Sequence, residues 1–288
     1  MKKKRIVAMV ATMGMVVGSQ ATLLLYEGFD YAGSLSNGAD LTGVSGGSGN
    51  WSGAWTNNGS AMAFSSTGLS YTDAGGRTLS ATGGAVADNA TGNGVVVAKR
   101  FYTPGTIGES GTLWFSMLVN YTDGAHDYVH FGGTDGTAGR DSGFGFAVGN
   151  GTVGGGIADD NLAASLSDNA GGLLNAGTTP AFTLGSTHLV VGRLSLVDGG
   201  NDTLDIWLDP ELTSAYFSTN AVDSSVTAGF VSVTNLFQIG SGAAAIATYD
   251  ELRLGTDVTD VIAIPEPMTL GLIGLSGIGI LFARRIMM

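Results

Sequence analysis

Short stretches rich in β-branched and aromatic residues recur along the chain, and Gly, Asn, Asp or Thr bounds each of them. Such stretches are typical of β-strands, and none before the C-terminal end shows the sustained helical repeat with capping residues that an amphipathic helix would show. The pattern therefore predicts an all-β, antiparallel domain folded as a two-sheet sandwich. The predicted strands are residues 23–29, 78–82, 95–102, 112–121, 128–131, 144–148, 188–197, 203–208, 230–240 and 247–254.

The clearest hairpin covers residues 188–210. A loop of Asp, Gly and Asn, which tolerate positive φ, joins its two strands, and Pro210 ends the second strand because proline has no amide hydrogen for the ladder. Successive strand residues point to opposite faces, so Asp205 and Trp207 share one face while Leu204 lies on the other. The hairpin thus predicts that Asp205 and Trp207 lie side by side, opposite a core face.

The N-terminal segment has the layout of a secretory signal peptide. Four basic residues at 2–5 precede an apolar run at 6–18, and Ser19-Gln20-Ala21 supplies small residues at both positions that a signal peptidase inspects. We expect cleavage after Ala21, so that residues 1–21 are removed. The alternative, an N-terminal membrane anchor, fits less well because the apolar run is short.

The C-terminal segment combines three features in order: Pro265-Glu266-Pro267, an apolar run up to Ala283, and Arg284-Arg285. The prolines favour an extended, accessible triplet, so a helix begins only after it. The apolar run is shorter than the ~20 residues of an average membrane helix and contains several glycines, so it predicts a poor permanent anchor. The positive-inside rule keeps the arginines cytoplasmic and places the triplet on the outer side.

This C-terminal arrangement, residues 265–288, resembles the PEP-CTERM sorting domain of Gram-negative bacteria. The resemblance implies that an exosortase processes the protein at Pro265-Glu266-Pro267, after transient insertion in the inner membrane, during export to the cell surface or biofilm matrix. Signal peptidase and exosortase are the implied export partners. A plain tail anchor that happens to follow two prolines is the alternative.

The amino-acid composition limits the classes of molecule that the region between the two terminal segments can bind. Six of the 12 basic residues and one of the 24 acidic residues, Glu266, lie in the terminal segments, which leaves six basic residues against 23 acidic ones. So acidic a domain should repel nucleic acid and anionic lipid headgroups, which leaves neutral polymers, cations or basic surfaces. The chain has no cysteine, so its stability must come from a large core rather than from disulfides, and its 48 glycines follow no collagen-like period.

Three short motifs give a second, weaker resemblance. They are Tyr-Glu-Gly-Phe-Asp at residues 26–30, the hairpin at 190–210, and Tyr-Asp-Glu-Leu-Arg-Leu-Gly at 249–255. In this order they resemble concanavalin A-like (laminin-G-like) jelly rolls, which implies one jelly-roll domain over residues 22–257 and a linker over 258–264. The resemblance supports the fold and does not imply an activity.

No motif predicts an enzyme. Family-16 glycoside hydrolases of this fold carry a Glu-x-Asp-x-x-Glu strand, and that spacing is absent here. Asp250 and Glu251 form the nearest acidic pair, but neighbours on a strand point to opposite faces, so a structural pair is favoured. His126, His130 and His188 are too few and scattered for a metal site or a catalytic triad. His126 and His130 could meet Asp127 around a turn, but surface positions are favoured for these two histidines.

Two loops are rich enough in carboxylates to be candidates for calcium. They contain Asp159 and Asp160, and Asp198 and Asp202. Asp, Asn and Gly are also the ordinary residues of tight turns, and this second interpretation is favoured. No other cofactor is expected.

The candidate carbohydrate-binding residues are Trp51, Trp55, Trp207 and Asp205. An exposed indole beside polar groups can stack on a sugar ring while the polar groups bind its hydroxyls. In the alternative interpretation, Trp51 and Trp55 fold back as lids on the sandwich.

Taken together, these patterns predict a non-enzymatic, exported surface or matrix protein with weak carbohydrate adhesion. The alternatives are a divergent polysaccharide hydrolase, which the missing carboxylate motif disfavours, and a purely structural coat component without a ligand.

Overall fold

The computed structural model describes residues 22–59, 62–79, 81–88, 96–103, 110–123, 127–132, 143–148, 161–167, 173–176, 182–229, 235–241 and 246–262. The predicted signal peptide, the Pro265-Glu266-Pro267 motif, the apolar run after it and Arg284-Arg285 lie outside these ranges. Within the ranges, no helix has both the length and the apolar character needed to cross a membrane.

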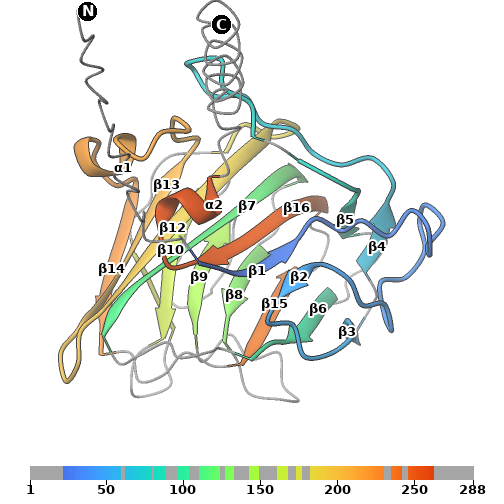
Figure 1. The fold of residues 1–288 in the computed structure, drawn as a ribbon, viewed down its shortest axis with the longest axis horizontal. Helices are drawn as coiled ribbons and strands as arrows, with labels where there is room; N and C mark the ends of the chain where they lie inside the picture. Colours follow the sequence, from blue (N-terminus) through green and yellow to red (C-terminus); the bar gives the residue numbers. More distant parts are fainter. Residues whose placement is uncertain are drawn as a thin grey trace, which may run out of the picture.

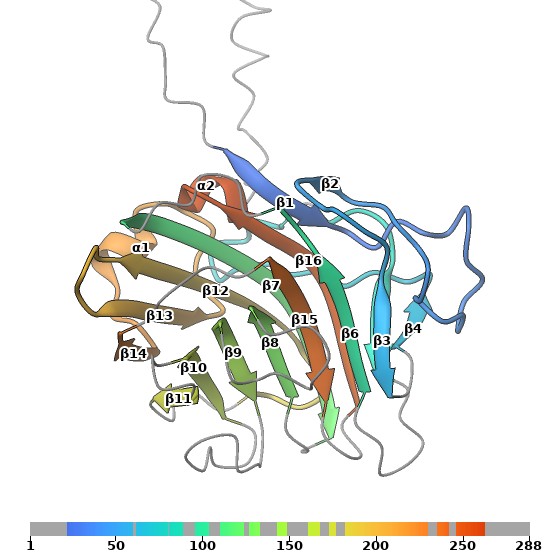
Figure 2. The same cartoon turned by 90° about the horizontal axis from the view of Figure 1, so that it is seen from below.

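Two sheets make up the fold, and every pairing between the described strands is antiparallel (Figures 1 and 2). One sheet has nine strands and the other seven, which confirms the predicted antiparallel sandwich. The path of the nine-stranded sheet is β14 (Ser224–Ala228), β13 (Asp202–Leu208), β12 (Thr187–Leu196), β7 (Gly111–Asp123), β16 (Ile246–Gly255), β1 (Leu23–Glu27) and β2 (Ser48–Gly49), with β5 (Ala85–Asp88) paired to β16 and β4 (Met62–Ser65) to β5. The order of the seven-stranded sheet is β11 (Leu173–Ala176), β10 (Leu162–Ser167), β9 (Phe144–Val148), β8 (Asp127–Phe131), β15 (Leu236–Ser241), β6 (Val96–Phe101) and β3 (Thr56–Gly59).

Aromatic residues from both sheets form the core between them. Phe131 of β8 lies 5.1 Å from Phe144 and 5.0 Å from Phe237, measured between ring centroids, and 5.5 Å from Phe115 of the opposite sheet. Alternate residues of each strand point into this core, as the period of two requires. The core members contributed by β7 are Leu113, Phe115, Met117, Val119 and Tyr121.

A second apolar layer covers part of the outer face of the nine-stranded sheet. The short helices α1 (Tyr216–Thr219) and α2 (Val258–Val261) lie over this face, and residues 69–79 supply further members of the layer (Figure 1). Ser116 of β7 donates a hydrogen bond to the carbonyl of Val261 at 2.6 Å, and Val261 and Ile262 are buried. The sandwich therefore extends to Ile262, past the predicted boundary at residue 257.

The strands missed by the sequence pattern are those poor in β-branched residues. β10 reads Leu-Ala-Ala-Ser-Leu-Ser and β3 reads Thr-Asn-Asn-Gly, so their neighbours in the sheets, rather than their own preferences, make them strands. The predicted strand at 78–82 is wrong in its described part, where only Thr78 bridges to Thr72. The strands without a counterpart in the prediction are β2, β3, β4, β5, β10, β11 and β14.

One buried ion pair joins the two sheets. The carboxylate of Glu27 on β1 accepts a hydrogen bond from Arg100 on β6 at 2.7 Å, and neither side chain is more than 3% exposed. Glu27 also accepts bonds from the Tyr31 hydroxyl at 2.8 Å and the Phe29 amide at 3.0 Å, while Arg100 donates to the carbonyl of Gly53 at 2.7 Å. Burial raises the pKa of Glu27, and the Tyr31 hydrogen bond and the charge of Arg100 oppose the rise.

Removing one partner of this pair should cost more than removing both. Arg100→Met leaves the Glu27 carboxylate buried without its cation, so we expect the free energy of unfolding to fall by about 3–5 kcal/mol. The double variant Glu27→Gln/Arg100→Met should recover part of that loss in urea titrations. Glu211→Gln is the control, because it removes the exposed partner of Arg77. A loss in Arg100→Met no larger than the control's would show that the inter-sheet pair does not stabilise the fold.

Candidate functional site

The predicted tryptophan platforms are mostly buried. Trp55 and Trp207 are each 1% exposed, so the expectation that they stack on a sugar at the surface is wrong. Trp51 is partly buried, its Nε1 donates to the carbonyl of Tyr26 at 3.0 Å, and the guanidinium of Arg100 lies 4.6 Å from its ring. Trp51 and Trp55 therefore fold back onto the sandwich as lids, the alternative that the sequence left open.

Trp207 and Asp205 do share the outer face of the nine-stranded sheet, as predicted, but Trp207 is covered. It stacks on Trp114 at 5.8 Å and meets Phe217 of α1 edge-on at 5.2 Å. The guanidinium of Arg193 lies 5.3 Å from the Trp207 ring and donates a hydrogen bond to Asp205 at 2.6 Å. The strand alternation revealed the face, whereas the helix over it had no counterpart in the sequence pattern.

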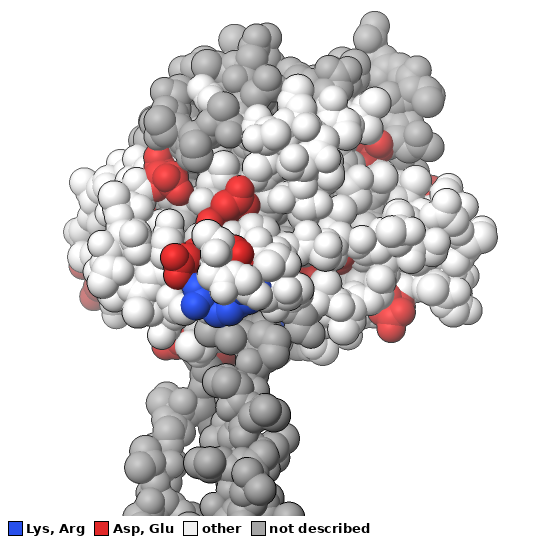
Figure 3. Space-filling view, turned by 90° about the horizontal axis from the view of Figure 1, so that it is seen from above, with Lys and Arg blue, Asp and Glu red and all other residues white. Residues whose placement is uncertain are grey.

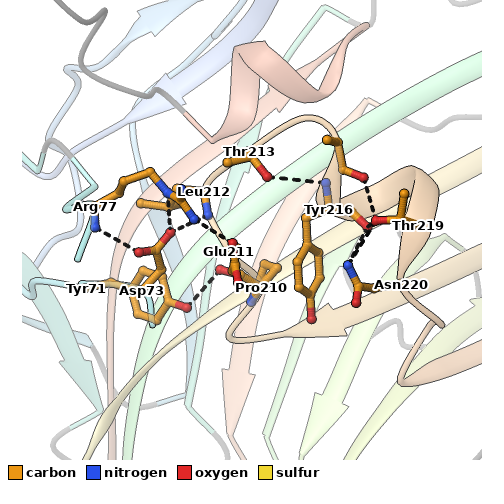
Figure 4. Close-up of polar contacts among 11 residues, drawn as sticks. Tyr71, Asp73, Arg77, Pro210, Glu211, Leu212, Thr213, Tyr216, Thr219 and Asn220 are labelled. Atoms are coloured by element: carbon orange, nitrogen blue, oxygen red, sulfur yellow. Dashed lines mark hydrogen bonds and ion pairs between the residues drawn. The ribbon is translucent and has the colours of Figure 1, made fainter. Parts of the chain in front are cut away.

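A polar clamp holds this cover in place (Figure 4). The carboxylate of Asp73 accepts bonds from the Leu212 amide and from Arg77 Nε, both at 2.7 Å, and Arg77 also pairs with Glu211 at 2.7 Å. The Tyr71 hydroxyl donates a hydrogen bond to the carbonyl of Pro210 at 2.9 Å. These bonds hold residues 71–77 against the loop that leads into α1. The position of α1 over Trp207 is thereby fixed, and Trp207 stays covered.

The acidic pair of β16 has a structural role. Pairing with β7 shifts register between Asp250 and Arg253, and Glu251 adopts a φ of 51°, so the pair sits in a bulge rather than a regular strand. Asp250 accepts a bond from the Leu69 amide at 2.8 Å and Glu251 one from the Thr82 amide at 2.7 Å. Both carboxylates thus hold backbone segments against the sheet, as the structural interpretation predicted.

Of the calcium candidates, Asp159 and Asp160 lie outside the described residues. Asp198 is exposed, and Asp202 is buried with its Oδ1 accepting the Val197 amide at 2.7 Å, which closes the hairpin turn. In the part of the chain that the structure describes, no group of three His, Asp or Glu side chains could hold a metal ion.

The surface position expected for His130 is wrong, and His126 lies outside the described residues. His188 is 6% exposed and its Nδ1 is 2.6 Å from Asp209, at the open end of the hairpin. His130 is fully buried in the middle of the seven-stranded sheet. Its position belongs to a feature that sequence reasoning did not find.

Residues from five adjacent strands form a line across the outer face of the seven-stranded sheet. Their sequence neighbours Ala98, Phe237, Val129, Phe146 and Ala164 belong to the inner core, so the line faces outward. We call this line the outer row. It consists, in paired register, of Lys99, Gln238, His130, Gly145 and Ser165.

The outer row is withdrawn from solvent although it is polar. Gln238, His130 and Ser165 are at most 1% exposed, and Ser165 Oγ has no hydrogen-bond partner among the described residues. A Cβ placed on Gly145 would lie 2.9 Å from Cδ2 of His130, so the imidazole leans across β9 toward Ser165. Lys99 is only partly buried and Thr56, next in register on β3, is exposed, so accessibility falls along the row from the β3 edge inward.

The outer row supplies donors and acceptors at regular steps. Adjacent strands are about 4.8 Å apart, so an ammonium, an amide, an imidazole and a hydroxyl succeed one another on that spacing, with one gap at Gly145. Burying such groups is costly unless they are hydrogen-bonded, and Nε2 of Gln238 donates to the carbonyl of Gly132 at 2.9 Å. Because the row is withdrawn from solvent between Gln238 and Ser165, it does not present these groups to a ligand at the surface.

No protein-family model and no curated protein matches this sequence. It is similar in structure to the globular domain of T. cruzi calreticulin, with a TM-score of 0.43 and 14% identity over 81% of this chain and 95% of that chain. Endo-β-1,4-glucuronan lyase from the fungus Trichoderma reesei gives 0.37 and 14% over 79% and 97%. The binding domain of botulinum neurotoxin serotype C1 gives 0.41 and 7% over 70% and 44%, so the chain spans less than half of that protein.

The carboxyl group of Asp250 should make stability depend on pH. Burial raises its pKa to about 8, although the Leu69 amide bond opposes the rise. The folded state then binds this proton more tightly than the unfolded state, where an aspartate has a pKa of about 3.9. The resulting stabilisation is present at low pH and is lost as pH rises from about 4 to about 8.

Asp250→Asn removes this titration, so the wild type should lose stability relative to the variant between pH 5 and pH 8, by an amount on the order of a few kcal/mol. Urea unfolding midpoints at the two pH values measure the difference. Asp198→Asn, a substitution at an exposed aspartate, is the control and should follow the wild type. Parallel pH profiles of wild type and Asp250→Asn would contradict the assignment.

Proposed function

We propose that this protein is an exported surface or matrix component of a Gram-negative bacterium whose β-sandwich binds neutral polysaccharide on an accessible sheet face. The signal-peptide pattern of residues 1–21 and the PEP-CTERM-like pattern of residues 265–288 support export. The observation that carries the binding function is a line of accessible hydroxyl groups across the outer face of the nine-stranded sheet, which we call the hydroxyl line. It consists, in paired register, of Thr112, Ser195, Thr203 and Thr227.

A polysaccharide fits the direction of the hydroxyl line. The line crosses β7, β12, β13 and β14 at right angles to their backbones, and its donors and acceptors are side-chain groups. A peptide recognised as an added strand would instead pair with backbone groups along one sheet edge. A sugar chain offers hydroxyl groups along its length to such side chains, so it matches the line better.

The charge distribution favours a neutral chain. Each arginine in the described residues, namely Arg77, Arg100, Arg193 and Arg253, forms an ion pair with a carboxylate. Figure 3 shows basic atoms next to acidic ones on a face that is otherwise largely uncharged in its described part. With 24 acidic residues in the sequence, the protein should repel a polyanion.

The residue types in the hydroxyl line support binding without hydrolysis. Glycoside hydrolysis by the common mechanisms needs two carboxyl groups flanking the scissile bond. The hydroxyl line contains no carboxylate, and Asp250 and Glu251 of β16 accept hydrogen bonds from the amides of Leu69 and Thr82. The polysaccharide hydrolase alternative is therefore not favoured.

Ser195→Ala tests the hydroxyl line with little disturbance of the fold. Because the Ser195 side chain is partly exposed and loses one hydroxyl, the free energy of unfolding should stay nearly unchanged, while affinity for a bound polysaccharide should weaken by about 1 kcal/mol. Affinity electrophoresis with hydroxyethyl cellulose, galactomannan and dextran, followed by calorimetry, measures this. Alginate serves as an anionic comparator and the exposed-loop variant Ser36→Ala as the matched control. Retention of none of the neutral polymers, or equal affinity of Ser195→Ala and wild type, would refute binding at the hydroxyl line.

The export part of the proposal has its own test. Replacing Pro265-Glu266-Pro267 by Ala-Ala-Ala leaves the apolar run and its basic end intact, so insertion should persist while processing fails. The variant should accumulate as a full-length membrane-bound precursor, whereas the wild type loses roughly its last two dozen residues. Replacing Arg284-Arg285 by Glu-Glu should instead impair orientation, since acidic residues contribute little to topology. Mass spectrometry of surface material from the native host distinguishes the two interpretations. An intact C-terminal peptide ending at Met288 would contradict processing and favour the plain tail anchor.

A further inference from the structure

A polar group lies between the two sheets at one end of the sandwich, among otherwise apolar side chains. Its two carboxyl groups belong to Asp88, the last residue of β5, and Asp127, the first residue of β8, which are 2% and 1% exposed. Val86 and Val129, two positions away on the same strands, are members of the inner core, so both carboxyl groups point into the space between the sheets. Two acidic side chains from opposite sheets are thus withdrawn from water.

Tyr249 of β16 shows that these two carboxyl groups are neighbours. Its hydroxyl donates a hydrogen bond to Oδ2 of Asp127 at 2.7 Å, which crosses from one layer of the sandwich to the other (Figure 2). Asp88 lies beside the same strand, because β5 pairs with β16 through Ala87 and Thr248. Burial raises the pKa of Asp127 well above its usual value, the Tyr249 hydrogen bond opposes the rise, and the charge of Asp88 adds to it. The two carboxyl groups are therefore close enough to repel each other when both are ionised.

Two oxygen atoms of this region have no hydrogen-bond partner among the described residues. They are Oδ1 of Asp127 and the hydroxyl oxygen of Tyr121, and both residues are 1% exposed. Tyr121 comes near the end of β7 and Asp127 begins the next strand, so the two lie at the same end of the sandwich. Ala247 of β16 pairs with Tyr121, and the register of β5 on β16 places Asp88 on the other side of this alanine. The acidic groups and the unpartnered oxygens thus gather around one short side chain of the inner core.

The buried charge of Asp127 requires a cation that the described side chains do not supply. A carboxylate withdrawn from water is destabilising unless it is paired or coordinates a metal ion. Lys99 lies on the outer face of its sheet, and the arginines of the described part of the chain pair with other carboxylates, namely Arg77, Arg100, Arg193 and Arg253. A bound cation would both neutralise the acidic groups and coordinate the unpartnered oxygens.

The donor atoms indicate which cation fits. Carboxylate and phenol groups offer oxygen alone, which hard divalent cations prefer. Calcium accepts irregular sets of oxygen ligands, whereas magnesium demands a near-ideal octahedron. A single ion also needs no open surface to enter by, because a metal ion can be bound as the chain folds around it. Calcium therefore suits this buried group.

We propose that one calcium ion binds between the sheets, held by the carboxylates of Asp88 and Asp127 and the hydroxyl oxygen of Tyr121, and that it clamps β5 to β8. The Tyr249 hydrogen bond occupies Oδ2 of Asp127, which leaves Oδ1 for the ion. No third acidic or histidine side chain of the described residues completes a metal-binding group, so water supplies further ligands. Two carboxylates give a weak site, with a Kd of about 10⁻⁴–10⁻³ M as in extracellular modules. The site is independent of polysaccharide binding at the hydroxyl line.

The test measures thermal unfolding of the purified full-length chain after a chelator has removed bound metal. Calcium chloride at 100 times the lower limit of this Kd range, about 10 mM, should raise the Tm by about 3–10 °C, because a ligand that binds only the folded state stabilises it. Titration of the rise against calcium concentration should fit one site. Magnesium chloride at the same concentration controls for ionic strength and should raise the Tm less.

Two pairs of variants locate the ion. Asp127→Asn keeps the size of the side chain and should abolish the calcium-induced rise, whereas Asp198→Asn, at an exposed aspartate of the hairpin loop, should respond as the wild type does. Tyr121→Phe removes a hydroxyl without a partner, so the calcium-free Tm should stay unchanged while calcium affinity falls about two- to tenfold. Its matched control is Tyr102→Phe, which removes another buried, unpartnered hydroxyl and should leave the calcium response intact.

Three results would overturn the calcium site. They are a Tm that does not respond to calcium, a response that Asp127→Asn and Tyr121→Phe leave unchanged, and a response to magnesium as large as that to calcium. If circular dichroism shows that Asp127→Asn does not fold, the comparison of Tyr121→Phe with Tyr102→Phe decides by itself. None of these results bears on retention by neutral polysaccharides, so the failure of the calcium site and the failure of the proposed function are told apart.

Discussion

The ion pair between Glu27 and Arg100 fixes how the two sheets meet at their N-terminal edge. A carboxylate and a guanidinium that are withdrawn from water are destabilising unless they form an ion pair. Glu27 and Arg100 form this pair across the space between β1 and β6. The same two side chains order the loop between these strands: Glu27 binds the Tyr31 hydroxyl, and Arg100 lies against Trp51. Trp51 and Trp55, the tryptophan lids on the sandwich, thus lie 4.6 Å and 5.9 Å from the Arg100 guanidinium of this pair.

The sequence could predict what depends on the local period of the chain. The alternation in the hairpin at 188–210 identified the common face of Asp205 and Trp207, because each strand shows its own pattern of faces. It could not predict that α1 covers Trp207, since a four-residue helix has no periodicity to detect. Strands such as β10 were missed because Ala and Ser give little preference for a strand until a sheet forms around them.

The outer row lay beyond sequence reasoning for a different reason. Its members come from segments as far apart as Lys99 and Gln238, and only the pairing of strands brings them into one line. In the sequence alone, His130 therefore looks like an isolated residue without a particular role. The one available signal was a polar residue in the middle of an apolar strand, as in Asp-Tyr-Val-His-Phe of β8, which is unusual for a fully buried strand.

The way the sheets are covered decides where binding can occur. On the nine-stranded sheet, α1, α2 and residues 69–79 bury one part of the outer face, so only the remaining part carries short hydroxyl side chains in contact with water. On the seven-stranded sheet, the apolar positions Val97, Tyr128, Ala147 and Ala163 flank a polar line that is itself buried. Both arrangements are built on paired strands rather than on loops. Paired strands are the most rigid elements of the fold, and the outer faces of the two sheets point in opposite directions.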